Sequence, residues 1–111
     1  ESAETVVEQE SVQTPEYLVP ISLNMDNGPR KGSFYAVSSS SRIGRAPDND
    51  ISLNANTVSS YHAEIFVKDN QFYIKDLDST NGTKINGEKI TESILASGAK
   101  LNIGEIEMSI K

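Results

Sequence analysis

His62, the only histidine of the chain, follows Ser59 by three residues in the stretch VSSYHAEI. A serine and a histidine act as nucleophile and general base when they lie within hydrogen-bonding distance of each other. Such a serine also needs oxyanion donors, commonly on a glycine-flanked turn. No glycine flanks Ser59, and residues three apart in a strand project from opposite faces. We therefore expect no catalytic pair here, and a structural hydrogen-bonding role for His62.

The stretch DLDST, residues 76–80, has the Asp-x-Asp-x-Thr spacing of phosphatases that use an aspartyl nucleophile. That chemistry needs an α/β fold, magnesium and helix N-termini for the phosphate, and the chain lacks the helices. The same stretch begins like a calcium loop, but Asn81 replaces the glycine at its sixth position and Gly87 the glutamate at its twelfth. A turn through Asn81 and Gly82 explains the residues better. We predict no metal site and no cofactor.

Arg45 is the cation best placed to bind an anion. Gly44 and Arg45 leave an expected strand and enter the proline-bearing stretch RAPDND. A guanidinium in such a loop binds a phosphate or a carboxylate with two parallel hydrogen bonds. Taken alone, however, Arg45 is more simply an ordinary surface arginine.

Composition limits the classes of function that remain. The chain has 111 residues, the length of one domain. It has no cysteine, which excludes disulfides, thiolate zinc sites and cysteine nucleophiles. The sequence shows neither a membrane-spanning apolar run nor a signal peptide, so we expect a cytoplasmic protein.

Charge is distributed unevenly along the chain. The formal net charge is −6, and residues 1–16 hold five acidic residues and no basic one. We interpret residues 1–16 as a disordered acidic tail or linker and residues 17–111 as the folded domain. The folded part, with 11 acidic and 10 basic residues, lacks the basic field that nucleic acid or an anionic membrane would require. We expect neither as a partner.

The elements that must position these residues are short strands. No window sustains helical apolar spacing over three turns, and TESILASG, residues 91–98, is the best helical candidate. Pro20 suggests that the first strand lies at a sheet edge. Many short strands separated by turns predict an all-β antiparallel sandwich or barrel. The expected strand segments are residues 17–24, 33–37, 38–45, 51–53, 63–68, 71–77, 83–86 and 88–90, and residues 100–110 are expected to form two strands around Gly104 with Ile106, Met108 and Ile110 on one face. Ile65 and Val67 alternate with the other residues of 63–68, and the two-residue break before 71–77 predicts a hairpin.

Five short motifs occur in an order and spacing that resembles the forkhead-associated (FHA) domain, a phosphothreonine-binding module, over about residues 17–111. The resemblance implies a β-sandwich of about eleven strands whose loops at one end bind the peptide. The motifs are Gly44-Arg45, Ser59-x-x-His62, Ser79-Thr80-Asn81-Gly82-Thr83, Ile85-Asn86-Gly87 and Leu101-x-Ile103-Gly104.

The resemblance also implies the roles of individual residues. Arg45 and Ser59 match the phosphate-binding pair, and Ser60 matches a position that often adds a second phosphate contact. Thr80 and Asn81 match positions that contact the surroundings of the phosphothreonine and the peptide backbone. Loop-shaping rather than ligand contact is implied for Gly44, His62 and Gly82.

Two departures from the family pattern affect affinity and specificity. Ser60 and Tyr61 stand where the family often has basic residues, so Arg45 is the one close cation, with Arg42 and Lys84 as second-rank supplements. We therefore expect modest affinity, on the order of micromolar. Residue 57 is threonine rather than a cation, so an acidic residue three positions after the phosphothreonine is not favoured, and an apolar one is our prediction.

The predicted function is phosphothreonine-dependent protein–protein interaction by a monomeric, non-enzymatic module. The expected partner is a threonine-phosphorylated protein or peptide, either a Ser/Thr kinase substrate or the kinase itself. Two alternatives remain open. One is an FHA-fold scaffold that binds protein independently of phosphate. The other is self-binding of the N-terminal tail after phosphorylation at Thr5 or Thr14.

Overall fold

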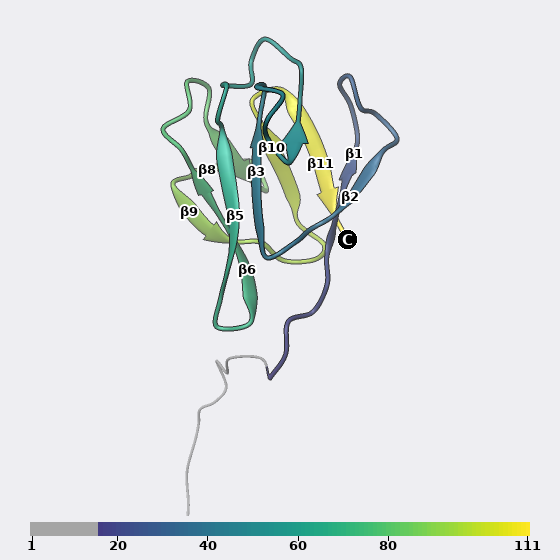
Figure 1. The fold of residues 1–111 in the computed structure, drawn as a ribbon, viewed down its shortest axis with the longest axis vertical. Helices are drawn as coiled ribbons and strands as arrows, with labels where there is room; N and C mark the ends of the chain where they lie inside the picture. Colours follow the sequence, from purple (N-terminus) through teal and green to yellow (C-terminus); the bar gives the residue numbers. More distant parts are fainter. Residues whose placement is uncertain (1–15) are drawn as a thin grey trace, which may run out of the picture.

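Short strands account for all the regular secondary structure that the computed structural model describes, which covers residues 16–111. In chain order they are β1 (Ser22–Met25), β2 (Phe34–Ala36), β3 (Ser40–Gly44), β4 (Ile51–Ser52), β5 (Ala63–Lys68), β6 (Gln71–Asp76), β7 (Thr83–Ile85), β8 (Glu88–Ile90), β9 (Glu92–Ile94), β10 (Lys100–Ile103) and β11 (Ile106–Ile110). One sheet has the order β2-β1-β11-β10-β7-β8, and the other has the order β4-β3-β5-β6-β9 (Figure 1). The predicted all-β sandwich of about eleven strands is confirmed. The predicted tail, with Thr5 and Thr14, lies outside the described residues except for Glu16.

Strand pairing is antiparallel except between β3 and β4. These two strands run parallel and share two residue pairs, Ile43 with Ile51 and Gly44 with Ser52. The loop between them, residues 45–50, therefore folds back along β3 before β4 begins. This places the segment RAPDND at the end of the sandwich where β3 ends.

The best helical candidate of the sequence, residues 91–98, does not form a helix. Residues Glu92–Ile94 form β9, which pairs with β6 through Tyr73 opposite Ile94 and Lys75 opposite Glu92. Two turns of helix are too short to be stable without tertiary packing. Pairing with the edge of β6 instead gives the backbone N–H and C=O groups of residues 92–94 hydrogen-bond partners from a strand distant in sequence. Within residues 16–111, no helix is available to cross a membrane.

The prediction from Pro20 that the first strand lies at a sheet edge is also wrong. Pro20 precedes β1, and β1 lies between β2 and β11. Because the proline is outside the strand, its missing N–H removes no hydrogen bond from the sheet. The edge strand on this side of the sheet is β2, which follows β1 in sequence.

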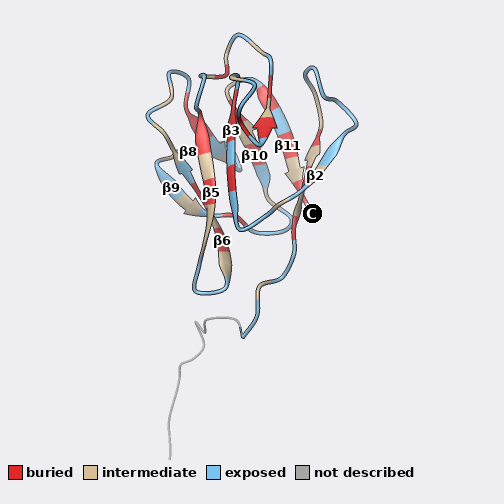
Figure 2. Ribbon diagram, viewed as in Figure 1, coloured by how far each residue is buried: buried red, intermediate tan, exposed pale blue. Residues whose placement is uncertain are grey.

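The core lies between the two sheets and is almost entirely aliphatic (Figure 2). Ile106, Met108 and Ile110, expected on one face of the last strand, are at most 2% exposed. They pack in one core cluster with Ile65 and Ile74 of the opposite sheet. Each fully buried aliphatic side chain contributes about 1.5–3 kcal/mol relative to an exposed one. The sandwich is therefore a stable platform for the loops that it carries.

Sheet topology brings several loops to one end of the platform. β3 and β6 both run antiparallel to β5, so the end of β3, the start of β5 and the end of β6 are adjacent. The loops 45–50, 53–62 and 77–82 consequently meet there. The turn between β10 and β11 lies at the same end, because Ile103 pairs with Thr83 at the start of β7.

Candidate functional site

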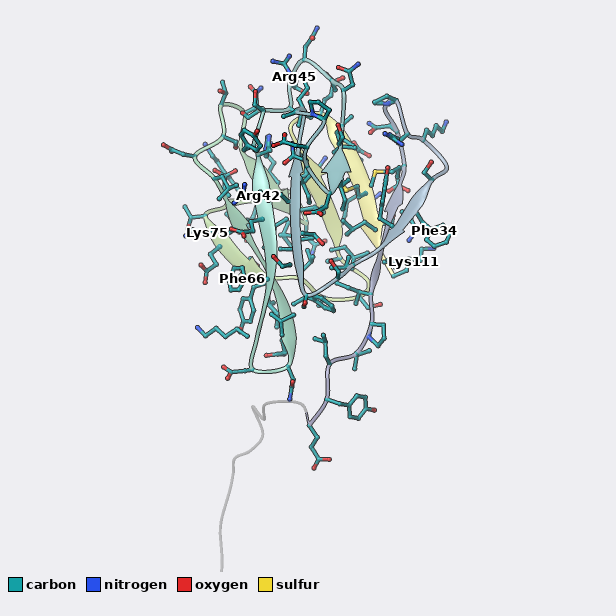
Figure 3. The ribbon with its side chains drawn as sticks, in the orientation of Figure 1. Phe34, Arg42, Arg45, Phe66, Lys75 and Lys111 are labelled. Atoms are coloured by element: carbon teal, nitrogen blue, oxygen red, sulfur yellow. The ribbon has the colours of Figure 1, made fainter. Side chains whose placement is uncertain are left out.

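An open cavity lies where these loops meet. Its lining comes from three loops far apart in sequence, and Arg45 is its one charged residue. In Figure 3, Arg45 lies at the loop end of the sandwich, whereas Arg42 lies further down the face of the sheet. The lining residues are Arg45, Asn56, Thr57, Val58, Ser59, Ser60, Thr80 and Asn81.

Gly44 allows Arg45 to leave β3 in close contact with the neighbouring loop. A Cβ at position 44 would lie 2.2 Å from the carbonyl oxygen of Ser60, so no other residue fits without a backbone shift. The Arg45 N–H donates to the carbonyl oxygen of Ser59 at 2.9 Å. The Arg45 side chain is exposed, and no carboxylate in residues 16–111 pairs with it. The guanidinium is therefore available to an external anion.

Asn49 fixes the loop that carries Arg45, and sequence reasoning did not find it. Its side chain is 7% exposed, and its Nδ2 donates to the carbonyl oxygens of Ala46 at 2.7 Å and of Ser60 at 2.8 Å. Its Oδ1 is buried without a partner among the described residues. The available signal was an asparagine within the turn-forming stretch RAPDND. The sequence does not show that the partner of Asn49 is the carbonyl oxygen of Ser60, eleven residues away.

His62 connects two of the loops from beneath the cavity. Its side chain is fully buried, and its Nδ1 accepts a hydrogen bond from the backbone N–H of Ser59 at 3.1 Å. Because Nδ1 is an acceptor, the ring proton lies on Nε2, which donates to the carbonyl oxygen of Gly82 at 2.9 Å. Both ring nitrogens are thus engaged with backbone groups. His62 holds the loops 53–62 and 77–82 at a fixed separation.

The Ser59 hydroxyl faces the cavity and is not bonded to His62. Its Oγ accepts a hydrogen bond from the N–H of Thr80 at 3.0 Å. Its own O–H has no acceptor among the described residues, so it can donate to a ligand. Asn81 donates from Nδ2 to the carbonyl oxygen of Thr57 at 2.9 Å, which leaves its Oδ1 as a possible acceptor.

The DLDST stretch forms the turn that the sequence suggests, organised by Asp76. The Asp76 carboxylate accepts hydrogen bonds from the Ser79 N–H at 3.0 Å, from the Ser79 hydroxyl, and from the Thr83 hydroxyl at 2.7 Å. Burial opposes ionisation of this group, but the hydrogen bonds outweigh it and hold the Asp76 pKa below its usual value. Asp78 and Gly82 both have positive φ angles, 60° and 89°. Asp76 is thus a structural acceptor beneath the loop.

The two second-rank cations do not reach the cavity. Arg42 lies in β3 opposite Glu64, and Lys84 lies in β7 opposite Asn102. Neither residue contributes to the cavity lining. The cavity therefore has a single cationic side chain, which is the arrangement that underlies the prediction of modest affinity.

Tyr61 stands where the family pattern often has a basic residue, and its side chain is a neutral phenol. Its O–H donates to the carboxylate of Asp48 at 2.9 Å, and this hydrogen bond raises the Tyr61 pKa. The contact joins the loops 45–50 and 53–62 outside the cavity. Tyr61 therefore links loops and supplies no positive charge.

A β-sandwich whose loops at one end present an arginine with no carboxylate partner in residues 16–111, together with a serine hydroxyl, belongs to the class of non-covalent anion-binding modules. A family model for the FHA domain matches residues 41–104. The chain belongs to the FHA domain family.

Curated proteins of Mycobacterium and Corynebacterium species are similar in sequence to this chain. The chain is 37% identical over 87 residues to the glycogen accumulation regulator GarA of Mycobacterium tuberculosis, and the match covers 78% of this chain and 54% of GarA. It is also 37% identical to the oxoglutarate dehydrogenase inhibitor of Corynebacterium jeikeium, with 78% of this chain and 60% of that protein covered. The chain thus spans little more than half the length of the curated relatives that it matches.

Solved structures of FHA domains superpose on most of the chain. One that was determined to study phosphothreonine-dependent FHA domain interactions has a TM-score of 0.76 at 32% identity, covering 84% of this chain and 96% of that one. Mycobacterium tuberculosis EmbR in complex with a low-affinity phosphopeptide has a TM-score of 0.75 at 31% identity, covering 83% of this chain and 24% of EmbR. Similarity in sequence and fold therefore extends over most of the described residues.

Proposed function

We propose that this FHA domain binds threonine-phosphorylated segments of other proteins at the cavity lined by Arg45 and Ser59. The observation that carries the proposal is that the Arg45 guanidinium and the Ser59 O–H line one cavity and have no partner within residues 16–111. A phosphothreonine brings a charge of about −1.5 to −2 and three acceptor oxygens. A cation and hydroxyl donors complement such a group.

The chemistry of the site supports binding without catalysis. His62 is the only histidine, it is buried, and both of its ring nitrogens bond backbone groups. It is therefore not available as a general base for Ser59. Asp76 is committed to Ser79 and Thr83. We infer a module that binds and releases its ligand unchanged.

The names of the relatives support a regulatory setting. GarA is a regulator of glycogen accumulation, and the Corynebacterium protein is an inhibitor of oxoglutarate dehydrogenase. We propose that the partner here is likewise a threonine-phosphorylated protein, either a Ser/Thr kinase substrate or the kinase itself. The balanced charge of residues 17–111 favours a protein over nucleic acid or a membrane surface. We further propose a monomeric, cytoplasmic module.

A titration monitored by amide chemical shifts tests the proposal. Phosphothreonine peptide pools are added to the labelled chain, with phosphoserine and unphosphorylated pools as controls. We expect the phosphothreonine pool alone to shift Arg45, Ser59 and Thr80 strongly, with dissociation constants on the order of micromolar. Equal shifts of the same loops by unphosphorylated peptides would instead support a scaffold that binds independently of phosphate.

A further inference from the structure

The turn between β10 and β11 contacts two of the cavity loops from the side of the six-stranded sheet. The N–H of Glu105 donates to Oγ1 of Thr57 at 2.9 Å, and the N–H of Gly104 donates to the carbonyl oxygen of Gly82 at 3.3 Å. Gly104 has a φ of 58°, and a Cβ there would lie 2.4 Å from the carbonyl oxygen of Thr57. The turn therefore packs directly against the backbone of the loop 53–62.

The turn is itself held from the opposite side. The Nδ2 of Asn27 donates to the carbonyl oxygen of Glu105 at 3.1 Å, and its Oδ1 accepts from the N–H of Glu107 at 2.8 Å. Asn27 lies in the loop between β1 and β2, so the turn is fixed between two loops. A turn fixed in this way is a rigid support for whatever it contacts.

Thr57 connects the β10–β11 turn to the cavity. Its hydroxyl oxygen accepts from Glu105, while its carbonyl oxygen accepts from Nδ2 of Asn81. It lies two residues before Ser59, and Val58 between them is 1% exposed. Displacement of Thr57 would therefore move both Asn81 and the Ser59 hydroxyl relative to Arg45.

We propose that Thr57 is a positioning residue of the phosphothreonine site, and that it acts through its hydroxyl bond to the β10–β11 turn. The inference rests on the proposed function of the cavity. Under it, Thr57 sets the placement of Ser59 and Asn81 and does not select the peptide residue three positions after the phosphothreonine. Its contribution to affinity is then the same for every phosphothreonine peptide.

Two substitutions separate the hydroxyl from the shape of the side chain. Thr57→Val keeps the branched shape and removes the hydroxyl, whereas Thr57→Ser keeps the hydroxyl. Thr91→Val is the matched control, because Thr91 is exposed, lies outside the cavity and has no side-chain partner among the described residues. Each variant is titrated with phosphothreonine peptides that differ only in the third residue after the phosphothreonine, which is Asp, Leu or Lys.

We expect Thr57→Val to weaken binding of all three peptides by about five- to tenfold, the effect of losing one positioning hydrogen bond. Thr57→Ser and Thr91→Val should bind within about twofold of wild type. In the free protein, Thr57→Val should shift the side-chain amide signals of Asn81 and the backbone amide of Ser59, and Thr57→Ser should leave them near their wild-type positions.

Three results would overturn the inference. One is wild-type affinity in Thr57→Val; a second is a loss confined to one of the three peptides, which would make Thr57 a direct reader of that residue. The third is an equal loss in Thr57→Ser. A wild-type chain that binds no phosphothreonine peptide overturns the proposed function and this inference together, whereas a binding wild type with an unaffected Thr57→Val overturns this inference alone.

Discussion

The sandwich core and the cavity loops are stabilised by different kinds of contact. Between the sheets, aliphatic side chains such as Leu23 and Ile65 are fully buried within one core cluster. In the loops, polar side chains bond backbone groups, as His62 does with Ser59 and Gly82. Apolar burial is non-directional, whereas hydrogen bonds constrain distance and angle. The core therefore supplies most of the free energy of folding, and the loop contacts set the geometry of the site.

The difference between the two regions implies that stability and binding can be changed separately. Substitutions in the core should alter stability alone, and substitutions of ligand-facing side chains should alter binding alone. Residues that brace the loops should affect both. Each expectation can be tested with one variant and a paired measurement of unfolding free energy and phosphopeptide affinity.

The largest effect on stability is expected from Leu23→Ala. Leu23 is fully buried in β1, and truncating it removes buried apolar surface and leaves a cavity. Such substitutions cost about 2–5 kcal/mol of unfolding free energy. Urea denaturation measures the loss, while the affinity of the remaining folded protein for a phosphothreonine peptide should stay at the wild-type value. A changed affinity would mean that core packing on the six-stranded sheet affects the loop geometry.

Arg45→Ala should have the opposite profile. Its side chain is exposed and pairs with no carboxylate of the described part of the chain, so thermal stability should be nearly unchanged, while affinity falls by about a hundredfold, or about 2.8 kcal/mol. Arg42→Ala is the matched control, because Arg42 is an exposed arginine three residues earlier, in β3, and does not line the cavity. It should bind within about twofold of wild type. A large drop in melting temperature for Arg45→Ala would show that Arg45 is structural.

His62→Ala lies between these two cases. It removes a buried ring and both of its hydrogen bonds, so we expect a loss of about 2–4 kcal/mol in unfolding free energy. Affinity should also fall severalfold, because the Ser59 N–H loses its acceptor. Denaturation and peptide titration at low temperature report the two effects. Unchanged stability together with abolished binding would instead place His62 in contact with the ligand.

The parts of the molecule that depend on local sequence were predictable. Alternating residues identified β5 and β6, and the face formed by Ile106, Met108 and Ile110 is buried as expected. Turn residues at Asn86 and Gly87 also form a turn, both with positive φ. These features could be predicted because each depends on neighbours within a few residues.

The parts that depend on distant partners were not predictable. Residues Glu92–Ile94 form a strand because β6 offers an edge, which the stretch TESILASG does not reveal. The bond between Thr57 and Glu105 joins residues 48 positions apart. Asn49 likewise braces its loop through Ser60, on a different segment of the chain. The side chains that we propose as ligand contacts carry a sequence signature, whereas those that hold the loops together become evident only in the folded chain.

The smallest effect concerns the pH dependence of the loop turn at Asp76. Its folded-state pKa is held below the ordinary value of 3.8, so the carboxylate stabilises the fold above that value, and the contribution disappears as pH falls through the folded-state pKa. Asp76→Asn should be less stable than wild type at neutral pH, and the difference should shrink as pH falls below about 4. Urea denaturation at a series of pH values measures it.

The matched control for that series is Asp78→Asn. Asp78 belongs to the same turn, but its carboxylate has no hydrogen-bond donor among the described residues, and asparagine tolerates its positive φ of 60°. This variant should follow the wild-type pH profile. If both variants changed the profile equally, the effect would belong to the general negative charge of the turn. A difference confined to Asp76→Asn would show that the stability of the loop 77–82 depends on the half-buried carboxylate of Asp76. The apolar packing between the sheets, by contrast, contains no group that titrates among the described residues.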